Sequence, residues 1–229
     1  MKKTAEERKY YEAYDERYKA VHQKGLHWFT DTQSPIVWEV MEKYGITSNM
    51  KLLELGCGEG RDAHRLLGKG YPLLATDISP EAIGFCRERW PDYANNFQIV
   101  DCIKDSLNEK FDFIYAVAVI HMLVLDEDRD AFYRFIHTHL TENGIALIGS
   151  MGDGNIEHQS DINRAFDWQE RDCRGEKVLV TGTSCRKVSN EAFAKELQRN
   201  HLAVVEKGQT SIPNHFPEMM YAVVKKSTD

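Results

Sequence analysis

Three acidic residues lie in or directly after apolar runs in the first half of the chain. Glu54 lies within the run at 52–55, Asp77 closes the run at 71–76, and Asp101 closes the run at 97–100. Ligands of open α/β sheets bind beyond the carboxyl ends of the strands, where such carboxylates could accept hydrogen bonds from hydroxyl and amino groups. An acid after a strand also serves as a turn or helix cap, so capping remains the alternative for each residue.

A glycine-dense turn follows the first of these runs. Gly56, Gly58 and Gly60 stand between the apolar run and a helical stripe within the stretch 51–67. Glycine has no Cβ, so backbone N–H groups and the helix N-terminus can approach a ligand closely. The pattern predicts a ligand-binding turn or, as the alternative, an ordinary tight connection between a strand and a helix.

Charge and spacing argue that this turn does not hold phosphates. Arg61 stands where a dinucleotide fingerprint requires its third glycine, and the Gly-Lys-Ser/Thr ending of a P-loop is missing. Glu54 and Glu59 would repel a pyrophosphate. Asp77 lies about twenty residues beyond the turn, where an acid after the second strand can bond a ribose diol. These features favour a nucleoside without phosphate groups.

Strand and helix patterns alternate around these residues. They predict strands at 52–55, 71–76, 97–100, 111–118, 145–150, 202–206 and 219–225, and helices at 35–44, 63–67, 80–89, 127–140 and 191–200. Strands that alternate with helices form right-handed crossovers and a parallel sheet with helices on both faces. The expected fold class is therefore α/β with a doubly wound sheet.

The ordered set of motifs resembles the class I S-adenosylmethionine-dependent methyltransferase family. The resemblance runs from about 51 to 150 and implies a seven-stranded, mainly parallel sheet whose last strand, 219–225, runs antiparallel. It also implies S-adenosyl-L-methionine as the cofactor. The residues that the resemblance places around this cofactor come from four strand ends: Glu54, Gly56, Cys57 and Gly58 at the methionine part, Asp77 and Ile78 at the ribose, Asp101 and Cys102 at the adenine, and Ala116 and Val117 after the fourth strand.

The end of the fourth strand informs the reaction class. Methyltransferases that act on amino groups of nucleic-acid bases carry an Asp/Asn-Pro-Pro-aromatic motif there, whereas this chain reads Ala116-Val117-Ala118-Val119-Ile120-His121. No Pro-Cys pair is present for covalent attack on a pyrimidine. His121 is a candidate general base, with a packed or capping histidine as the alternative.

Two segments lie outside the alternating pattern. The stretch 4–21 is predicted to be an amphipathic helix with an aromatic face (Tyr10, Tyr11, Tyr14 and Tyr18), and Trp28 after it could line the cofactor or pack in the core. The stretch 151–188 contains one strand-like piece, 177–181. We expect one domain over 1–229, with 1–48 as a helical cover and 151–188 as an insertion on the substrate side.

Composition limits the partners. The formal net charge of −7 opposes binding to nucleic acid, and no apolar run is long enough to cross a bilayer. The five cysteines form no C-x-x-C pair, and charged residues occupy 6–8 where a signal peptide would be apolar, so we expect a cytoplasmic protein. His158, Asp161, Asp167 and Asp172 lack a metal-ligand spacing, so no metal is expected.

The sequence thus favours an enzyme that methylates a nucleophilic O, N or S atom of a small molecule. The alternatives are a non-catalytic protein that binds S-adenosylmethionine or S-adenosylhomocysteine, and an RNA or protein methyltransferase. A transferase that moves an aminopropyl group would need an acidic pair where Ala116 and Val117 stand. These motifs do not specify the acceptor atom or the oligomeric state.

Overall fold

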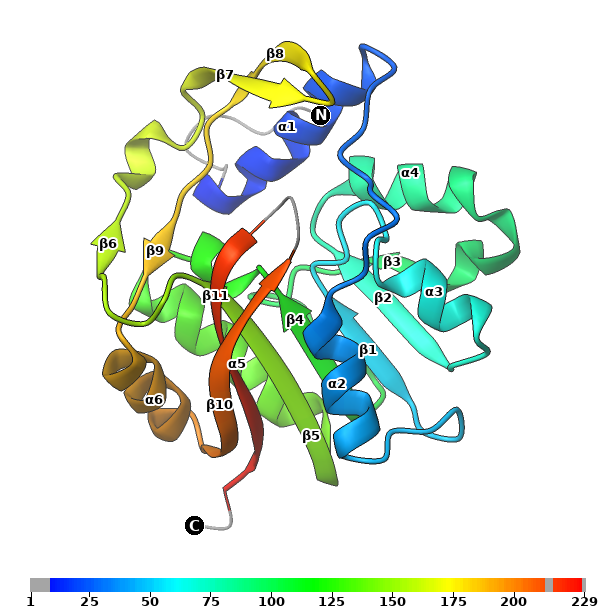
Figure 1. The fold of residues 1–229 in the computed structure, drawn as a ribbon, viewed down its shortest axis with the longest axis vertical. Coiled ribbons are helices and arrows are strands. Elements are labelled where there is room, and N and C mark those ends of the chain that lie inside the picture. The colour runs from blue at the N-terminus through cyan, green and yellow to red at the C-terminus, as the bar shows by residue number, and fades with distance from the viewer. Residues whose placement is uncertain (1–8, 213–215, 228–229) are drawn as a thin grey trace.

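A seven-stranded sheet forms the centre of the molecule. The computed structural model describes residues 9–212 and 216–227. The strands lie in the order β10, β11, β5, β4, β1, β2, β3 (Figure 1). Their bounds are β1 Leu52–Leu55, β2 Leu73–Asp77, β3 Phe97–Ile99, β4 Phe111–Val117, β5 Leu140–Met151, β10 Leu202–Ile212 and β11 Phe216–Lys226.

Strand direction places the loops that follow β1, β2, β3 and β4 at one edge of the sheet. The pairs β1–β2, β1–β4, β2–β3 and β4–β5 are parallel. Strand β11 is inserted antiparallel between β5 and β10. The predicted doubly wound sheet with an antiparallel last strand is therefore confirmed, although β5, β10 and β11 are longer than their apolar patterns indicated.

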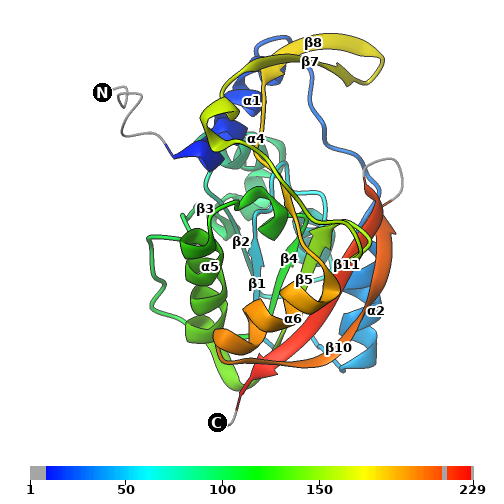
Figure 2. The ribbon, with the colours of Figure 1, turned by 90° about the vertical axis from the view of Figure 1, so that its left-hand side faces the viewer.

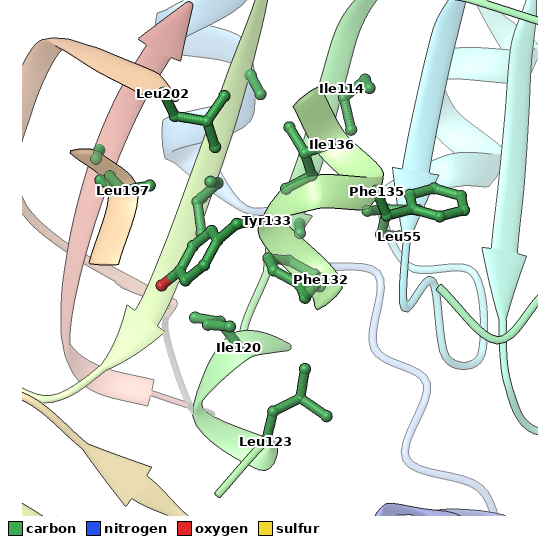
Figure 3. Close-up of a cluster of buried hydrophobic side chains, with 14 of the residues drawn as sticks. Leu55, Ile114, Ile120, Leu123, Phe132, Tyr133, Phe135, Ile136, Leu197 and Leu202 are labelled. Atoms are coloured by element: carbon green, nitrogen blue, oxygen red, sulfur yellow. The ribbon is translucent and has the colours of Figure 1, made fainter. Parts of the chain in front are cut away.

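Helices cover both faces of the sheet. On one face α2 Pro35–Lys43, α3 Ala63–Gly68 and α4 Pro80–Arg89 pack against one buried cluster. On the other, α5 Asp126–His139 and α6 Asn190–Arg199 pack against a second (Figure 2). Figure 3 shows Phe132, Tyr133 and Ile136 of α5 gathered with Leu197 of α6 in this second cluster. The two cores fix the sheet and hence the positions of its strand ends.

The N-terminal segment and the insertion lie together at one end of the sheet (Figures 1 and 2). A short 3₁₀ turn, η2 Tyr10–Glu12, leads into α1 Ala13–His22, which packs on a hairpin formed by β7 Trp168–Cys173 and β8 Glu176–Thr181. Val21 is buried there with Val178 and Val180. The short strands β6 His158–Gln159 and β9 Arg186–Lys187 pair at the base of the insertion, which also contains η5 Ile162–Arg164.

The prediction of a single strand in the insertion was wrong. Strand β8 matches the predicted piece at 177–181, but β7 pairs with it along its whole length. Strand β7 was missed because its sequence, WQERDC, is mostly polar. Only Cys173 of that strand is buried. Residues 4–8 of the predicted N-terminal helix lie outside the described residues, and one domain over 1–229 remains a prediction.

Two 3₁₀ turns lie in the connections next to the strands of the sheet. The 3₁₀ turn η3 Pro91–Asn96 leads into β3, and η4 Ile120–Met122 follows β4.

Within the described residues, no helix has both the length and the apolar composition that crossing a bilayer requires.

Candidate functional site

The turn after β1 adopts a backbone that only glycine accommodates without strain. The φ angles of Gly56, Gly58 and Gly60 are 71°, 53° and 75°. A Cβ on Gly56 would lie 2.5 Å from Cγ2 of Val119, and a Cβ on Gly58 would lie 2.7 Å from the Tyr18 hydroxyl oxygen. The turn is therefore approached closely by the segment that follows β4 and by α1, which agrees with either alternative of the sequence analysis.

Asp77 organises the turn. Its Oδ2 accepts a hydrogen bond of 2.8 Å from the Gly58 N–H, and its Oδ1 accepts one of 2.9 Å from the Ser79 N–H. Burial raises the pKa of Asp77 above its usual value, although both backbone hydrogen bonds act to lower it. The carboxyl group therefore caps the chain after β2, and it also lines the cavity described below. Capping and ligand binding are thus compatible roles for this residue.

Asp101 stands at the next strand end. Its Oδ1 accepts a hydrogen bond of 3.0 Å from the Ile103 N–H, and its Oδ2 lies 3.4 Å from the Tyr11 hydroxyl. Lys104 Nζ lies 3.2 Å from the same Oδ2. Burial raises the pKa of the neighbouring Cys102 thiol, so this cysteine is protonated at neutral pH. Asp101 offers a hydrogen-bond acceptor to a ligand, and Cys102 contributes a largely apolar surface.

A cavity of about 90 Å³ brings these strand ends together. Its lining consists of Tyr11, Tyr14, Tyr18, Leu55, Gly56, Thr76, Asp77, Ile78, Val100, Asp101, Cys102, Ile103, Val119, Met122 and Leu123. Pockets for small ligands usually measure about 300–1,000 Å³. Three of the lining residues are tyrosines from the N-terminal segment, so side chains of that segment occupy part of the space above the strand ends.

Polar tethers hold α1 over the cavity. Asp15 Oδ1 accepts hydrogen bonds from the Ser79 hydroxyl at 2.7 Å and the Glu81 N–H at 3.1 Å. His22 lies between two carboxylates, with Nε2 2.9 Å from Glu59 and Nδ1 2.8 Å from Glu81. These carboxylates raise the pKa of His22 against the effect of burial. His22 therefore links α1 to both the glycine turn and α4 through Glu59 and Glu81.

Further hydrogen bonds join the N-terminal segment to α5 and to the insertion. The Tyr10 hydroxyl donates to Asp128 Oδ2 at 2.7 Å and accepts from the Val124 N–H at 2.9 Å. The Thr181 hydroxyl donates to the Ala13 carbonyl at 2.9 Å, and Arg17 donates to the Thr181 carbonyl. The N-terminal segment and the hairpin thus form one covering layer, which we call the cover (residues 10–22 and 168–181).

Glu54 and Cys57, which were predicted to face the cofactor, lie beneath the turn. The Tyr115 hydroxyl donates to Glu54 Oε2 at 2.9 Å, and burial, with Asp62 nearby, raises the pKa of Glu54 to about 8. Glu54 is therefore largely protonated at neutral pH. The buried Cys57 thiol lies 3.7 Å from the Gly58 carbonyl oxygen, and the Cys86 thiol donates to the same oxygen at 3.3 Å. Both Glu54 and Cys57 support the turn from below.

Ala116 and Val117 are also absent from the cavity lining, because they belong to opposite buried cores of the sheet. The chain turns at Ala118, whose φ of 62° is unusual for a residue other than glycine. This turn brings Val119, two residues later than predicted, into the lining. Trp28 is likewise absent from the lining; its ring centroid lies 6.1 Å from that of Tyr18, and its backbone N–H donates to Glu59 Oε1 at 3.1 Å.

His121 is buried away from the cavity. The side chain is 2% exposed, and its ring packs edge-on against Phe216. Burial, together with Arg129 and Lys187, lowers the pKa of His121 to about 3. A histidine with this pKa is neutral and weakly basic at physiological pH, so the geometry gives no support to a role as general base. Its Nδ1 has no hydrogen-bond partner among the described residues.

Within the described ranges, no three His, Cys, Asp or Glu side chains are grouped so as to hold a metal ion. The acids of the site are spread over separate strand ends and are bonded to backbone N–H groups or to tyrosines.

Sequence reasoning missed most of the apolar lining. The tyrosine spacing did signal an aromatic face, but not that this face would lie over Gly58.

Comparison with known proteins identifies the central part of the chain. Residues 53–146 match the family model described as "Methyltransferase domain". This stretch contains β1, β2, β3 and β4 and all three strand ends that carry Gly56, Asp77 and Asp101. The three strand ends of the cavity floor therefore lie within the stretch that matches the family model.

Two curated relatives match parts of the chain. Hemagglutinin 1 of Eikenella corrodens is 35% identical over 102 residues, which cover 42% of this chain and 32% of that protein. The malonyl-[acyl-carrier protein] O-methyltransferase of Bacillus cereus is 24% identical over 175 residues, which cover 75% of this chain and 59% of that protein. The matched regions thus span less than two thirds of either relative.

Solved structures share the fold. A methyltransferase described as S-adenosylmethionine-dependent, from Clostridium acetobutylicum, superposes with a TM-score of 0.64 at 17% identity, covering 95% of this chain and 99% of that one. The 1,6-didemethyltoxoflavin-N1-methyltransferase of Burkholderia thailandensis, solved with its substrate and S-adenosylhomocysteine, gives 0.64 at 16% identity, covering 95% and 89%. Both similarities cover nearly the whole length of this chain.

Proposed function

We propose that this chain, which belongs to the class I S-adenosylmethionine-dependent methyltransferase family, transfers a methyl group from S-adenosyl-L-methionine to an O, N or S atom of a small molecule. The observation that carries the proposal is the convergence of Gly56, Asp77 and Asp101 on one cavity. Each comes from a different strand end, at the edge where open α/β sheets bind their ligands.

The residues of the cavity fit a nucleoside without phosphates. Asp77 and Asp101 are acceptors for ribose hydroxyls and an adenine amino group, and the lining contains no Lys or Arg to neutralise a phosphate. Gly56 lines the cavity, and glycine at Gly56 and Gly58 keeps the backbone of the turn open to the methionine part. Glu59 Oε2 is buried without a hydrogen-bond partner among the described residues, so it can accept a donor from a ligand beside the turn.

When bound, S-adenosylmethionine supplies a methyl group activated by a sulfonium centre. The chain's own residues orient the reactants and exclude water, which can supply most of the acceleration in a reaction of this kind. The rings of Tyr11, Tyr14 and Tyr18 line the cavity. Aromatic faces attract cations, so tyrosines are suitable neighbours for a sulfonium. No strong base is required of His121.

The cover must move to admit the ligand. The cavity of about 90 Å³ is smaller than a nucleoside pocket requires, and Tyr14 and Tyr18 of α1 stand within its walls. Polar tethers to Ser79, Glu81 and Glu59 hold α1 over the cavity, and we infer that it shifts outward for binding and closes over the reactants. In this proposal the cover, together with the rest of the insertion (151–188), provides the substrate-side wall.

Three observations favour a small-molecule acceptor. The space under the cover is enclosed, the net charge of −7 opposes a polyanion, and the end of β4 lacks the base-methylation motif. Among the proteins with the same fold, the toxoflavin enzyme is a small-molecule methyltransferase by its name, whereas the malonyl relative acts on a carrier-bound group. We propose the free small molecule here.

A methyl-transfer screen tests the proposal. The full chain is incubated with S-adenosylmethionine bearing a labelled methyl group and with metabolite extracts, and products are found by mass spectrometry. We expect labelled small molecules with the chain and less label with Asp77→Ala at a cofactor concentration that does not saturate the variant. Label in RNA or protein instead would contradict the substrate class. Tight binding of S-adenosylhomocysteine without any labelled product would favour a non-catalytic binding protein.

A further inference from the structure

A second pocket lies on the other side of the glycine turn. It has a volume of about 410 Å³ and is lined by His27, Phe29, Asp31, His64, Arg89, Trp90 and Arg174. It shares none of these residues with the cofactor cavity. Gly60 faces it, since a Cβ there would lie 2.6 Å from the Trp90 ring. The volume falls within the range of about 300–1,000 Å³ that is usual for ligand pockets.

Two guanidinium groups with no carboxylate partner border this pocket. Arg174 donates a hydrogen bond of 2.7 Å to the Phe29 carbonyl, and the Arg89 guanidinium carbon lies 4.6 Å from the Phe29 ring centroid. Within residues 9–212 and 216–227 neither arginine forms a salt bridge, although acids outnumber bases in the sequence by 36 to 29. Both guanidinium groups therefore retain donors for an anion.

The backbone at Arg174 is specialised. Arg174 and Gly175 form the two-residue turn between β7 and β8, with φ angles of 57° and 83°. Turns of this type favour asparagine or glycine at the first position, and a long side chain there is strained. Strained positions of this kind cluster at functional sites. Here the strained turn holds the Arg174 guanidinium group at the pocket.

The other charged groups facing the pocket leave it positive. Asp31 is the one carboxylate in the lining, and its Oδ1 is already paired with Arg65 at 3.1 Å and His64 at 3.3 Å. His27 Nδ1 is buried without a hydrogen-bond partner among the described residues. Burial lowers the pKa of His27, and Arg174 and Arg89 lower it further. The imidazole is therefore neutral and can donate or accept at that atom.

The geometry points to a binding site for an organic oxyanion, a carboxylate or phosphate monoester carried on an apolar body. We propose that Arg89 and Arg174 bind the oxyanion and that Phe29 and Trp90 contact the apolar part. Planar guanidinium groups match both kinds of oxyanion, often through paired hydrogen bonds. The ligand differs in charge from the proposed cofactor and occupies a separate site. His64 Nδ1, which donates to the Gly60 carbonyl at 3.0 Å, connects the pocket wall to the turn.

Isothermal titration calorimetry of the full chain at low ionic strength tests this site. The probes are phenyl phosphate, benzoate, inorganic phosphate and neutral phenol. We expect one site for phenyl phosphate or benzoate, with phenol and inorganic phosphate weaker by about tenfold or more. The tighter of the two organic anions identifies the oxyanion. Equal binding of inorganic phosphate and both organic anions would overturn the requirement for an apolar body.

Variants locate the site. Arg174→Gly suits the positive φ and preserves the turn, and Arg89→Gln preserves polarity. Each should weaken the better probe by about tenfold, whereas Arg134→Gln, at an exposed position of α5, should not. Saturating S-adenosylhomocysteine should leave the stoichiometry of the probe unchanged. Unchanged affinity in the Arg89→Gln, Arg174→Gly double variant, or displacement of the probe by S-adenosylhomocysteine, would overturn the proposal.

Discussion

The floor and the cover of the cofactor cavity are held in place by different forces. The floor, formed by the turns after β1, β2 and β3, is fixed by backbone pairing within the sheet and by two buried cores. The cover rests on a small apolar cluster around Val21 and on side-chain tethers such as Asp15–Ser79 and His22–Glu59, and only its first residues, Tyr10, Tyr11 and Ala13, reach one of the large cores. Elements with few buried apolar contacts open at lower cost than core elements. We therefore expect α1 and the hairpin to move more readily than the floor.

The largest expected effect comes from a substitution in the floor. Gly56→Ala places a Cβ 2.5 Å from Val119 on a left-handed backbone. Strain and overpacking together should cost about 2–5 kcal/mol of unfolding free energy. Gly70→Ala, where φ is 80° and no atom lies within 4 Å of the new Cβ, should cost only about 1–2 kcal/mol. Urea unfolding measures both, and equal costs would mean that Val119 gives way to the new Cβ and that the floor is not tightly packed at Gly56.

Asp77→Ala sharpens the role of the floor in binding. The substitution leaves the N–H groups of Gly58 and Ser79 without their acceptor and removes the proposed partner of the ribose. Affinity for S-adenosylhomocysteine should fall by about 1–3 kcal/mol. Asp77→Asn, which keeps one acceptor oxygen, should lie between this variant and the wild type. The exposed Asp92→Ala serves as the control. Calorimetry showing unchanged affinity in a folded Asp77→Ala protein would assign Asp77 to capping alone.

Tyr18→Ala tests the contribution of the cover separately from that of the floor. The Tyr18 hydroxyl lies against Gly58, so removing the ring should open space for the cofactor and disturb closure over the reactants. We expect affinity for S-adenosylhomocysteine to stay within about threefold and turnover to fall by about tenfold or more. Tyr18→Phe, which keeps the ring, should retain most activity. The comparison fails if Tyr18→Ala lowers affinity and turnover by the same factor.

The smallest expected effect is a pH dependence confined to the cover. Because Glu59 and Glu81 raise the pKa of His22, the stabilisation from His22 is fully present below its unfolded pKa of about 6.5. It is lost as pH rises through the folded pKa. Hydrogen-exchange protection of α1, corrected for intrinsic exchange rates, should decrease over this range in the wild type.

His22→Gln supplies the control for that pH effect. The variant should show little pH dependence in the protection of α1, while the strands of the floor behave as in the wild type. Glu54 also titrates in the floor, with its pKa raised to about 8, so global stability should decline as pH rises from about 4.5 toward 8 in both proteins. An α1 protection profile that is identical in wild type and His22→Gln would remove His22 from the account.

The floor was largely predictable from sequence because its signals are local. Glycines at fixed spacing and an acid at the end of a strand are read within a few residues, and Gly56, Asp77 and Asp101 all line the cavity. Ala116 and Val117, expected at the cofactor, are absent from the lining, and the strand pattern does not reveal that the chain turns at Ala118 with a positive φ.

The cover was less predictable because its contacts join distant parts of the chain. Tyr18 meets Gly58, and α1 packs on a hairpin about 150 residues later in the sequence. Strand β7 has mostly exposed polar residues, so it carries little of the alternation by which strands are recognised. The pocket with Arg89 and Arg174 likewise unites segments that share no local pattern.

Calorimetric titration of the full chain with S-adenosylhomocysteine and, separately, with NAD tests the central claim most directly. The acids of the floor, the absence of Lys and Arg from the cavity lining and Arg61 in place of the third fingerprint glycine all favour a nucleoside without phosphates. We predict one site for S-adenosylhomocysteine, weakened in Asp77→Ala, and no measurable binding of NAD at the same concentrations. Tighter binding of NAD than of S-adenosylhomocysteine would contradict the account.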